Sequence, residues 1–568
     1  MPSNTQPSQK RRKIKDRRVI SVSSTTGTHP LNVRPLGNAF FVEKTDGPSR
    51  SSQMGYFSML NEDLFMELLG FVDDSKSLMA LAHTSRVLYA YLYDEDLWKL
   101  HYTGKVQRLE KQGQSAPPLT WRGSWRLSVL GIPSKYLANL QLPGNLLCSD
   151  VLYRPFQCSQ VEYDKLFHDL IEDEEGYKNA CLKSIEHLET LPDMPNGHIP
   201  RLSETNLSQS DFDSRRNKEP FILVNSDESR WPRWDLSSLL KRFSDVKFRQ
   251  EAVQWPLSLY SEYLAQNCDE SPLYLFDCGS EAMKTLRKEY NVPELFQQDL
   301  FKLFQDCRPD HAWLIIGSKR SGSTFHKDPN YTSAWNAALS GRKLWVMFPP
   351  GVTPPGVSTD LEESEVTSPV GIAEWVLSGF YNEATGVPEA QIGITFPGEC
   401  MYVPSGWWHM VINLDDSVAL TQNFVPEVKL ANALHFLKNK RTQLSGFRPL
   451  EVRQKLQEIL ESFQDTNDDD MTKIRAYAKK FDELNLQEFL QTEDCGEIMA
   501  SQLPAMPVFE LFRKLLILGG KQEELAKALE ELAKIEKLEH AKVTGKSEAW
   551  TKLTEESSFS FGFGGDFE

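Results

Sequence analysis

The stretch GSTFHKDPNYTSAWNAALSGRKLWVMFPP, residues 322–350, decides the fold and contains the first half of a candidate metal site. Within it, His326 and Asp328 are separated by one residue, so both side chains point to the same face if the segment is a strand. The second half is His409, inside GECMYVPSGWWHMVINL at residues 398–414. Two histidines and one carboxylate form the face that holds non-haem Fe(II) with three positions open. The sequence therefore predicts a metal centre assembled from distant segments.

The chain has the composition of a multidomain globular protein. Its 568 residues exceed what one core supports, so about two to four domains are expected. The formal net charge of −16 makes nucleic acid an unlikely partner. No apolar run reaches the length of a membrane span, and the polar N-terminus has no secretory signal, so we expect an intracellular protein without membrane contact. The eight cysteines form no C-x-x-C pair, which excludes the usual zinc-finger spacings and a disulfide framework.

The N-terminal residues 1–55 are rich in Ser, Thr, Pro and charge, and they are predicted to form a disordered tail. Within this tail, the residues from Lys10 to Lys15 and then Arg17 and Arg18 form a compact basic cluster. Such a cluster is typical of a nuclear-localisation signal and also of a solvated basic tail. We expect a nuclear or cytoplasmic location, or both, and the cluster favours the nucleus.

Residues 56–102 have apolar positions at helical spacing and are predicted to form a small three-helix unit. The positions are Leu64, Leu68 and Phe71, then Leu78, Leu81 and Leu88, with Trp98 near the end. The pattern D-D-S-x-x-L-x-x-L, the Ser85-Arg86 pair and the closing D-L-W resemble an F-box, although Asn61 stands where a proline is usual. The resemblance implies docking on the Skp-type adaptor of a cullin-RING ubiquitin ligase through residues 57–101. The alternative is a plain helical hairpin of the larger domain.

The rest of the chain divides by its pattern. Residues 103–219 are predicted to be a connecting region that ends in a polar linker, 201–219, and they carry no chemical motif. A strand-rich domain follows at 220–426, with an acidic surface loop at 352–368. Leucines at helical spacing predict a helical region at 427–545, and residues 546–568 are predicted to be a disordered tail. The leucine stripes indicate internal packing or, as the alternative, a homodimer interface.

Six blocks of the central domain carry a family resemblance. They are SPLYLFD at 271–277, GSKRSGSTFHKDP at 317–329, TSAWNA at 332–337, GRKLW at 341–345, VPSGWWH at 403–409 and LTQNF at 420–424. In this order they resemble a JmjC-type cupin dioxygenase of the lysyl-hydroxylase branch typified by the protein once called the phosphatidylserine receptor. The implied fold class is multidomain α+β, with a double-stranded β-helix (jelly-roll, cupin-type) core, the N-terminal F-box-like unit and a C-terminal helical region.

The resemblance also implies a site. Fe(II) is expected on His326, Asp328 and His409, with Lys327 facing away. Lys343 stands where the family has the lysine that pairs with the distal carboxylate of 2-oxoglutarate, and an anion would compensate the cost of burying this cation. Four further residues match positions around the cosubstrate: Asn336, Tyr274, Ser323 and Thr421, of which Ser323 replaces a threonine. The tryptophans Trp335, Trp407 and Trp408 are expected to be core and pocket wall rather than a cage for a methylated cation.

The implied activity is an Fe(II)- and 2-oxoglutarate-dependent dioxygenase that uses O2 and releases succinate and CO2. Its target is expected to be a protein side chain, with lysine hydroxylation favoured and demethylation of an N-methyl group as a variant. An RNA substrate fits the acidic chain less well. The alternative function is an F-box substrate receptor in which the JmjC domain mainly binds the substrate. Because no predicted iron ligand lies in residues 57–101, their deletion is expected to leave 2-oxoglutarate turnover measurable.

Overall fold

A computed structural model describes residues 50–116, 119–136, 163–168, 170–171, 198–267, 269, 271–360, 363–364, 366–367, 371–377, 379–484 and 503–555. The described residues divide into two compact units. The first unit contains the residues up to 297 and residues 310–424, and the second contains residues 298–309, 425–484 and 503–555. The predicted basic cluster at residues 10–18 lies outside the described residues, so the nuclear location stays a prediction. No described helix combines the length and the apolar composition that crossing a membrane requires.

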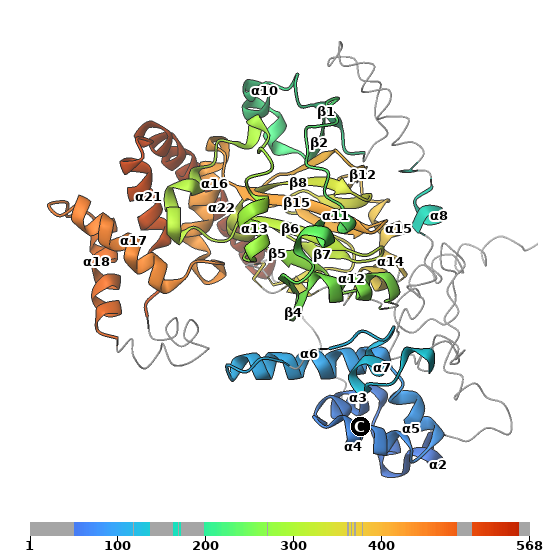
Figure 1. Ribbon diagram of the computed structural model, residues 1–568. Coiled ribbons are helices and arrows are strands. Elements are labelled where there is room, and N and C mark those ends of the chain that lie inside the picture. Colours follow the sequence, from blue (N-terminus) through green and yellow to red (C-terminus); the bar gives the residue numbers. More distant parts are fainter. Residues whose placement is uncertain are drawn as a thin grey trace, which may run out of the picture. The chain divides into compact units, whose positions relative to one another are not determined.

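The first unit is built on two β-sheets (Figure 1). The strands of the large sheet are β1 (Arg201–Ser203), β2 (Phe221–Val224), β3 (Lys247–Gln250), β4 (Val253–Pro256), β5 (Leu275–Asp277), β6 (Ala312–Gly317), β8 (Ser333–Ser340), β13 (Cys400–Val403) and β15 (Ser417–Phe424). The small sheet contains β7 (Gly322–His326), β9 (Lys343–Phe348), β12 (Gln391–Thr395) and β14 (Trp408–Asn413). Their orders are β1-β2-β13-β8-β15-β6-β5-β3-β4 and β12-β9-β14-β7. Because consecutive strands alternate between the sheets from β6 to β9 and again from β12 to β15, this is the predicted double-stranded β-helix. A short hairpin of β10 (Ser358–Thr359) and β11 (Val366–Thr367) lies in the predicted 352–368 loop.

Alternation along the strands separates two cores. One face of the small sheet meets the large sheet in a cluster that includes Trp345, Met347 and Val411 from the former and Ala334 and Met401 from the latter. The opposite face of the small sheet is apolar as well, because every second residue of β9 and β14 points there. It is covered by α8 (Tyr163–Leu166), α14 (Ile372–Leu377) and α15 (Phe380–Ala384). The small sheet is therefore buried on both faces, which explains its near-continuous apolar strands.

The N-terminal helices of the first unit are α2 (Arg50–Met54), η1 (Gly55–Met59), α3 (Glu62–Gly70), α4 (Ser75–Ala82), α5 (Arg86–Tyr91), α6 (Glu95–Lys111) and α7 (Trp125–Leu130). The side chains of Asn61 and Asp74 cap α3 and α4, because their oxygens accept hydrogen bonds from the first-turn N–H groups. The predicted three-helix unit with an end at residue 102 is wrong in extent. Helix α6 continues through this boundary to Lys111, since its buried stripe includes Tyr102 and Val106 as well as Trp98.

The remaining helices of the first unit surround the sheets. They are η2 (Ser134–Tyr136), α10 (Gln209–Ser214), η4 (Arg216–Lys218), α11 (Leu236–Phe243), α12 (Leu257–Gln266), α13 (Glu281–Leu286), η5 (Glu294–Phe296) and η7 (Pro329–Tyr331). The predicted linker at 201–219 is wrong, because it contains β1, α10 and η4. Strand β1 pairs in parallel with β2, so the sheet begins before the predicted start at residue 220. The polar composition of this segment suits an edge strand followed by a helix that Ser208 caps.

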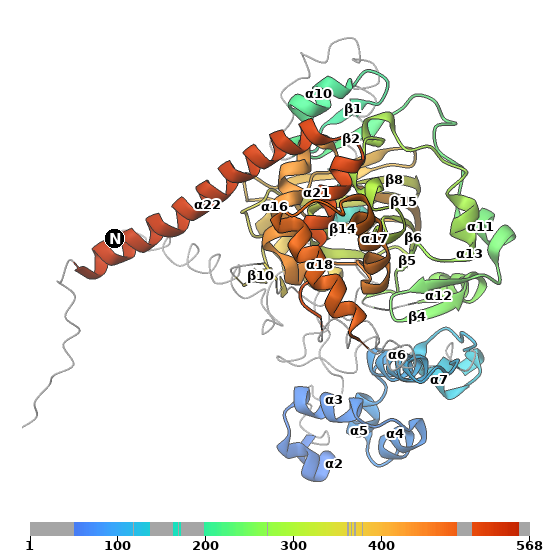
Figure 2. The same ribbon diagram turned by 90° about the vertical axis from the view of Figure 1, so that its left-hand side faces the viewer.

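The second unit is helical. It contains η6 (Leu300–Cys307), η8 (Glu427–Lys429), α16 (Leu430–Asn439), η9 (Arg441–Gln443), α17 (Pro449–Ser462), α18 (Asp469–Asp482), α21 (Val508–Leu518) and α22 (Gln522–Glu555). The leucine stripes predict α16, α17 and α22 correctly, and Asp468 is the N-cap of α18. Helix α22 runs past the predicted end of the helical region at 545, as one long helix that extends beyond α16 and α21 (Figure 2). The homodimer through these helices stays a prediction.

A buried ion pair ties β1 to the barrel. Arg201 contacts Glu399, just before β13, with its Nε and Nη2 each donating over 3.0 Å to one carboxylate oxygen. Both side chains are almost fully buried, and Arg201 also donates to the carbonyl oxygen of Ile394. The backbone N–H of Phe396 also donates to the Glu399 carboxylate. Each charge is therefore compensated only while the other is present.

We expect Arg201→Met to lower the free energy of unfolding of the first unit by about 3–5 kcal/mol, because it leaves a buried carboxylate uncompensated. The matched control is Arg215→Met, which breaks the exposed pair with Asp211 and should cost less than about 1 kcal/mol. Urea unfolding followed by circular dichroism measures both. Equal losses of unfolding free energy in the two variants would show that the buried pair stabilises the first unit no more than the exposed pair does.

Candidate active site

The three predicted metal ligands come together in the first unit. His326 is the last residue of β7 and His409 lies directly opposite it on β14, with the ring centroids 4.1 Å apart. Asp328 follows β7 and precedes η7, and ligand atoms of all three residues lie within 4.8 Å of one another. The proximity agrees with the sequence. Strand β7 ends at His326, and Asp328 follows it with extended backbone dihedrals, just outside the hydrogen-bonded strand.

Backbone contacts orient the two imidazoles. Nδ1 of His326 lies 2.7 Å from the carbonyl oxygen of Thr324, and Nδ1 of His409 lies 3.1 Å from that of Trp407. A proton on each Nδ1 leaves Nε2 as the lone-pair donor. Burial, together with the neighbouring His326, lowers the pKa of His409 well below its ordinary value. His409 is therefore neutral at physiological pH, which is the form that binds a metal ion.

The buried carboxylate of Asp328 is suited to a metal cation. Burial raises the pKa of Asp328, and this shift is opposed by His326 and by a hydrogen bond from Asn423. Its Oδ2 is buried and has no hydrogen-bond partner among the described residues. A buried carboxylate oxygen without a partner is costly unless a cation meets it. Two imidazoles and this oxygen fit a divalent metal ion of borderline hardness, such as Fe(II).

A break in the strand register places Ser323. Val411 lies opposite Ser323, whereas His409 lies opposite His326, so one strand has an extra residue between these pairs. Without this bulge, three residues of separation would put Ser323 and His326 on opposite faces. With it, Ser323 lines the same cavity as His326, where the resemblance expects it.

Lys343 is fully buried at the start of β9. Its Nζ donates to Oη of Tyr274 over 3.1 Å and to Oδ1 of Asn413 over 2.8 Å. None of the ion pairs between described residues includes it, and burial lowers its pKa to about 7. A buried ammonium group that contacts only neutral oxygens is ready for an anionic ligand. The phenol of Tyr274 stays neutral, because burial raises its pKa far above the ordinary value.

Asn413 is a site residue that sequence reasoning missed. It accepts from Lys343 and donates from Nδ2 to Oγ of Ser321 over 2.9 Å. Because Asn413 lies four residues after His409 on the same strand, the even spacing puts both on the inner face. This spacing was a usable signal.

Asn336 and Thr421 lie opposite each other on β8 and β15. Oδ1 of Asn336 is buried and has no hydrogen-bond partner among the described residues, while Oγ1 of Thr421 donates to the carbonyl oxygen of Trp335 over 2.8 Å. Cross-strand partners share one face of a sheet. The two residues are therefore adjacent on the inner face, and the unused amide oxygen and the partly buried hydroxyl are available to a ligand in the barrel.

Other charged and aromatic side chains near the site face elsewhere. Lys327 forms an ion pair with Glu363 and lies over the ring of Trp408, so it points away from the iron ligands as expected. The guanidinium of Arg342, next to Lys343, is held by Asp415 and Asp164, at 2.7 Å in each pair. The predicted tryptophans Trp335, Trp407 and Trp408 are buried in packed clusters and provide no cage.

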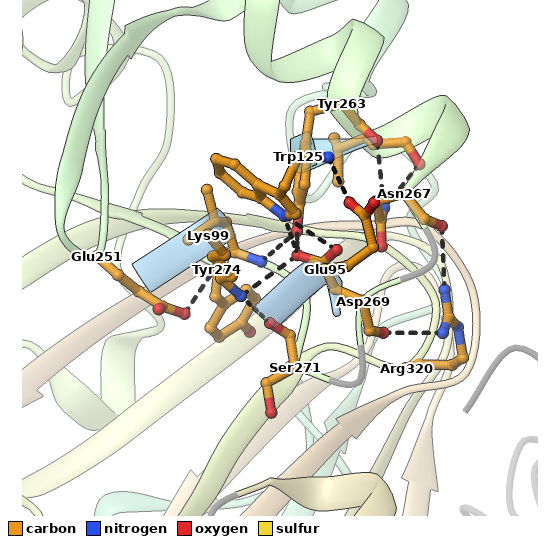
Figure 3. A network of polar contacts seen from close by, with 12 residues as sticks. Glu95, Lys99, Trp125, Glu251, Tyr263, Asn267, Asp269, Ser271, Tyr274 and Arg320 are labelled. Carbon is orange, nitrogen blue, oxygen red and sulfur yellow. Dashed lines mark hydrogen bonds and ion pairs between the residues drawn. The ribbon is translucent and has the colours of Figure 1, made fainter. Parts of the chain in front are cut away.

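A cavity of about 580 Å³ opens beside His326. It is lined by Tyr274 and Phe276 of the β5 segment, by Ser321 to Thr324, by Gly371 and Ile372, and by Arg249, Glu251, Ser271, Pro272 and Arg320. The wall at Ser271 is tied to the N-terminal helices by the polar network in Figure 3, in which Lys99 of α6 donates to the carbonyl oxygen of Ser271 over 2.5 Å. The N-terminal helices therefore support the segment that carries Tyr274.

Asp269 is the centre of this network (Figure 3). Its carboxylate accepts from Nε1 of Trp125 at 2.8 and 3.0 Å and from Oη of Tyr263 at 2.6 Å, and it pairs with Lys99 at 3.3 Å. Its backbone carbonyl accepts from Arg320, another residue of the cavity wall. Helix α6 thus belongs to the body of the oxygenase domain. Residues 57–101 do not form a separable module, and their deletion removes Lys99, so turnover in such a deletion does not test the iron site alone.

The fold and this site define a class. A double-stranded β-helix with a two-histidine, one-carboxylate cluster beside a buried lysine is the arrangement of non-haem iron oxygenases that bind a dicarboxylate cosubstrate.

Comparison with known proteins agrees. Residues 236–430 match the model of the cupin-like domain family. The chain is 34% identical over 431 residues to "Arginine-specific demethylase JMJ22" of Arabidopsis thaliana, covering 73% of this chain and 77% of that protein. It is 33% identical to "Bifunctional arginine demethylase and lysyl-hydroxylase psr-1" of Caenorhabditis elegans, covering 46% and 71%. It is 28% identical to "2-oxoglutarate and iron-dependent oxygenase JMJD4" of Mus musculus, covering 32% and 44%. The chain belongs to the JmjC family of cupin-like oxygenases and is an enzyme that uses Fe(II), 2-oxoglutarate and O2.

If Lys343 binds the distal carboxylate, Lys343→Met should weaken 2-oxoglutarate binding by about 2–5 kcal/mol, which is at least roughly thirtyfold in KM. Iron content should change little, because the ammonium group is not a ligand. The control is Arg342→Gln, whose guanidinium already has two carboxylate partners and should leave the KM near wild type. The reverse ranking of the two variants would assign the cosubstrate to Arg342.

The role of Lys343 also predicts a pH dependence of the KM for 2-oxoglutarate. The protonated Lys343 is the form that attracts the dicarboxylate, and its pKa in the ligand-free protein is about 7. Below pH 7 the ammonium is already present, and above pH 7 its population falls. The KM for 2-oxoglutarate should therefore rise between pH 7 and 9, by up to about tenfold per unit, in wild type and not in Lys343→Met.

Proposed function

We propose that the chain is a protein oxygenase whose iron is held by His326, Asp328 and His409. The observation that supports this proposal is that His326, His409 and the buried Lys343 lie on strands of the same small sheet, with Asp328 directly after one of them. In the overall reaction a C–H bond, 2-oxoglutarate and O2 become C–OH, succinate and CO2. The bound iron supplies the activation of O2. If the hydroxylated carbon is an N-methyl group, the product loses formaldehyde and the result is demethylation.

The residues of the chain supply binding, orientation and exclusion of water. Lys343 and Tyr274 form the deep end that receives the distal carboxylate, supported by Asn413. Asn336, Thr421 and Ser323 are the neighbouring polar groups that resemble the family's cosubstrate positions. The packed apolar face around Trp345 and Met347 closes the inside of the barrel to solvent. Such a dry, preorganised pocket holds the cosubstrate next to iron without competing water.

For the substrate we propose a protein side chain, with lysine hydroxylation favoured and N-methyl demethylation as the variant. The support is the resemblance of the six sequence blocks and the printed names of the relatives, which include a lysyl-hydroxylase and arginine and lysine demethylases. The open side of the 580 Å³ cavity beside His326 gives a protein side chain access to the ligands.

The double variant His326→Ala with Asp328→Ala should lose iron and reduce 2-oxoglutarate consumption to the background of a metal-free sample, because it leaves one ligand. The iron content of the purified protein and succinate formation measure the two effects. A mass-spectrometric search for +16 products in cells that express wild type or this variant then identifies the substrate. Normal turnover by the double variant would falsify the iron assignment.

We propose, as a second function, that α3 docks on a Skp-type adaptor of a cullin-RING ligase. Phe65 and Leu69 of α3 are buried in the core of the helical segment. Leu64, Leu68 and Phe71 lie on the neighbouring, outer face and are 52%, 39% and 76% exposed. Their i, i+4, i+7 spacing makes one exposed apolar stripe.

The apolar positions predicted for this segment divide between its own core and its surface. Leu78 and Trp98 are fully buried, and Nε1 of Trp98 donates to the carbonyl oxygen of Leu92. They stabilise the helical segment, whereas Leu64 and Leu68 are exposed enough to reach a partner. If the adaptor binds, the oxygenase domain presents its substrate to the ligase; the alternative is that this domain binds the substrate without modifying it.

We expect Leu68→Asp combined with Phe71→Asp to reduce co-purification of the adaptor by more than about thirtyfold, because buried apolar anchors dominate such interfaces. Turnover of 2-oxoglutarate should persist, since neither residue contacts the cavity. The control is Leu538→Asp on α22, which changes another exposed leucine, in the second unit. Adaptor binding that survives the double variant, or absence of binding by wild type, removes the ubiquitin-ligase proposal.

A further inference from the structure

Two aromatic side chains of the large sheet form an exposed platform at the cavity. Phe276 of β5 and Trp313 of β6 stack with centroids 5.1 Å apart and planes inclined by 29°. Phe276 lines the cavity that contains His326, and 40% of its surface is exposed. An aromatic side chain this open is not explained by burial in the core.

The strand register puts both rings on the inner face of the sheet. Phe276 lies opposite Ile315, and Ile315 lies opposite Ala419. These two apolar residues pack with Tyr274 and Trp313 in a small cluster. Trp313 lies opposite Thr421, which in turn lies opposite Asn336. Cross-strand partners share a face, so the platform continues the row of predicted cosubstrate residues toward the mouth of the barrel.

We propose that Phe276 and Trp313 bind the cationic side chain, lysine or arginine, of the protein substrate. Aromatic faces attract ammonium and guanidinium groups, and the aliphatic stems of both side chains pack on the same rings. The inference rests on the proposed protein oxygenase function and names its substrate class. The names of the relatives include an arginine demethylase and a lysyl-hydroxylase, whose targets both carry such a cation.

The platform is not already occupied by the protein's own cations. None of the cation–π contacts between described residues involves Phe276 or Trp313. The two arginines of the cavity wall are turned to backbone carbonyl oxygens: Arg249 donates to that of Glu251, and Arg320 donates to those of Asn267 and Asp269. The wall also contains Glu251, whose Oε1 accepts from the backbone N–H of Tyr274, so the aromatic faces act together with one carboxylate in attracting a cation.

The test uses four pools of random peptides with one fixed central residue: lysine, arginine, norleucine or citrulline. The last two keep the shape of the side chain and lack the charge. With the full-length, iron-loaded enzyme, the lysine or the arginine pool should stimulate succinate formation at lower concentration than its neutral counterpart. Phe276→Leu should raise the half-saturating concentration of that pool by about 3- to 30-fold. Phe276→Tyr should restore it to within about twofold, since it keeps the π-face.

Phe243→Leu is the matched control, because Phe243 is a partly exposed aromatic residue of α11 that lies under Arg242 and does not line the cavity. It should behave as wild type. Trp313→Leu is a secondary variant. Phe276 is the preferred position for the test, because replacing an exposed side chain disturbs folding least.

Three results overturn the inference. They are wild-type half-saturation in Phe276→Leu, equal stimulation by charged and neutral pools, and stimulation by neither cationic pool. If 2-oxoglutarate consumption still depends on iron in the last case, the oxygenase function stands and only the cationic substrate class is wrong. If no consumption depends on iron in any pool, the proposed function itself fails and the inference falls with it.

Discussion

The burial of Lys343 is the constraint on which the site depends. Its ammonium group lies inside the barrel and contacts only the neutral oxygens of Tyr274 and Asn413. Beside it the barrel buries Asp328 Oδ2 without a hydrogen-bond partner among the described residues. In a ligand-free protein both groups are costly, since each prefers water or an opposite charge. A metal ion and a dicarboxylate offset both costs, so ligand binding and the stability of the barrel are coupled.

The register of the strands determines which side chains face the inside of the barrel. The small sheet supplies His326, His409 and Lys343, whereas the large sheet supplies Asn336, Thr421 and the aromatic platform. A shift of one residue in any of these strands would turn its functional side chains to the opposite face. The bulge between β7 and β14 shows the same dependence, because it is what allows Ser323 and His326 to share a cavity.

The sequence predicts what depends on local pattern and on recognisable motifs. The order of the six blocks identified the barrel, the candidate ligands and, by its position in the family resemblance, Lys343. Asn413 was missed although its even spacing from His409 was a usable signal, whereas the contact of Asn423 with Asp328 follows from the fold and not from local pattern. Strand β1 was mistaken for a linker for the same reason: three polar-flanked residues become a strand only because β2 is there to pair with them.

The extent of the helical segment shows why sequence boundaries mislead about function. The F-box resemblance covers residues 56–102, yet Lys99 within this segment hydrogen-bonds the wall of the oxygenase cavity. One helix therefore serves the core behind the exposed stripe of α3 and also the segment that carries Tyr274. A ligand shifts a conformational equilibrium only by its differential affinity for the two conformations. A partner on α3 would therefore change 2-oxoglutarate binding only if α6 has two arrangements and the partner prefers one of them. The proposed docking stripe of Leu64, Leu68 and Phe71 does not line the cavity beside His326, so the proposed adaptor binding does not by itself exclude turnover.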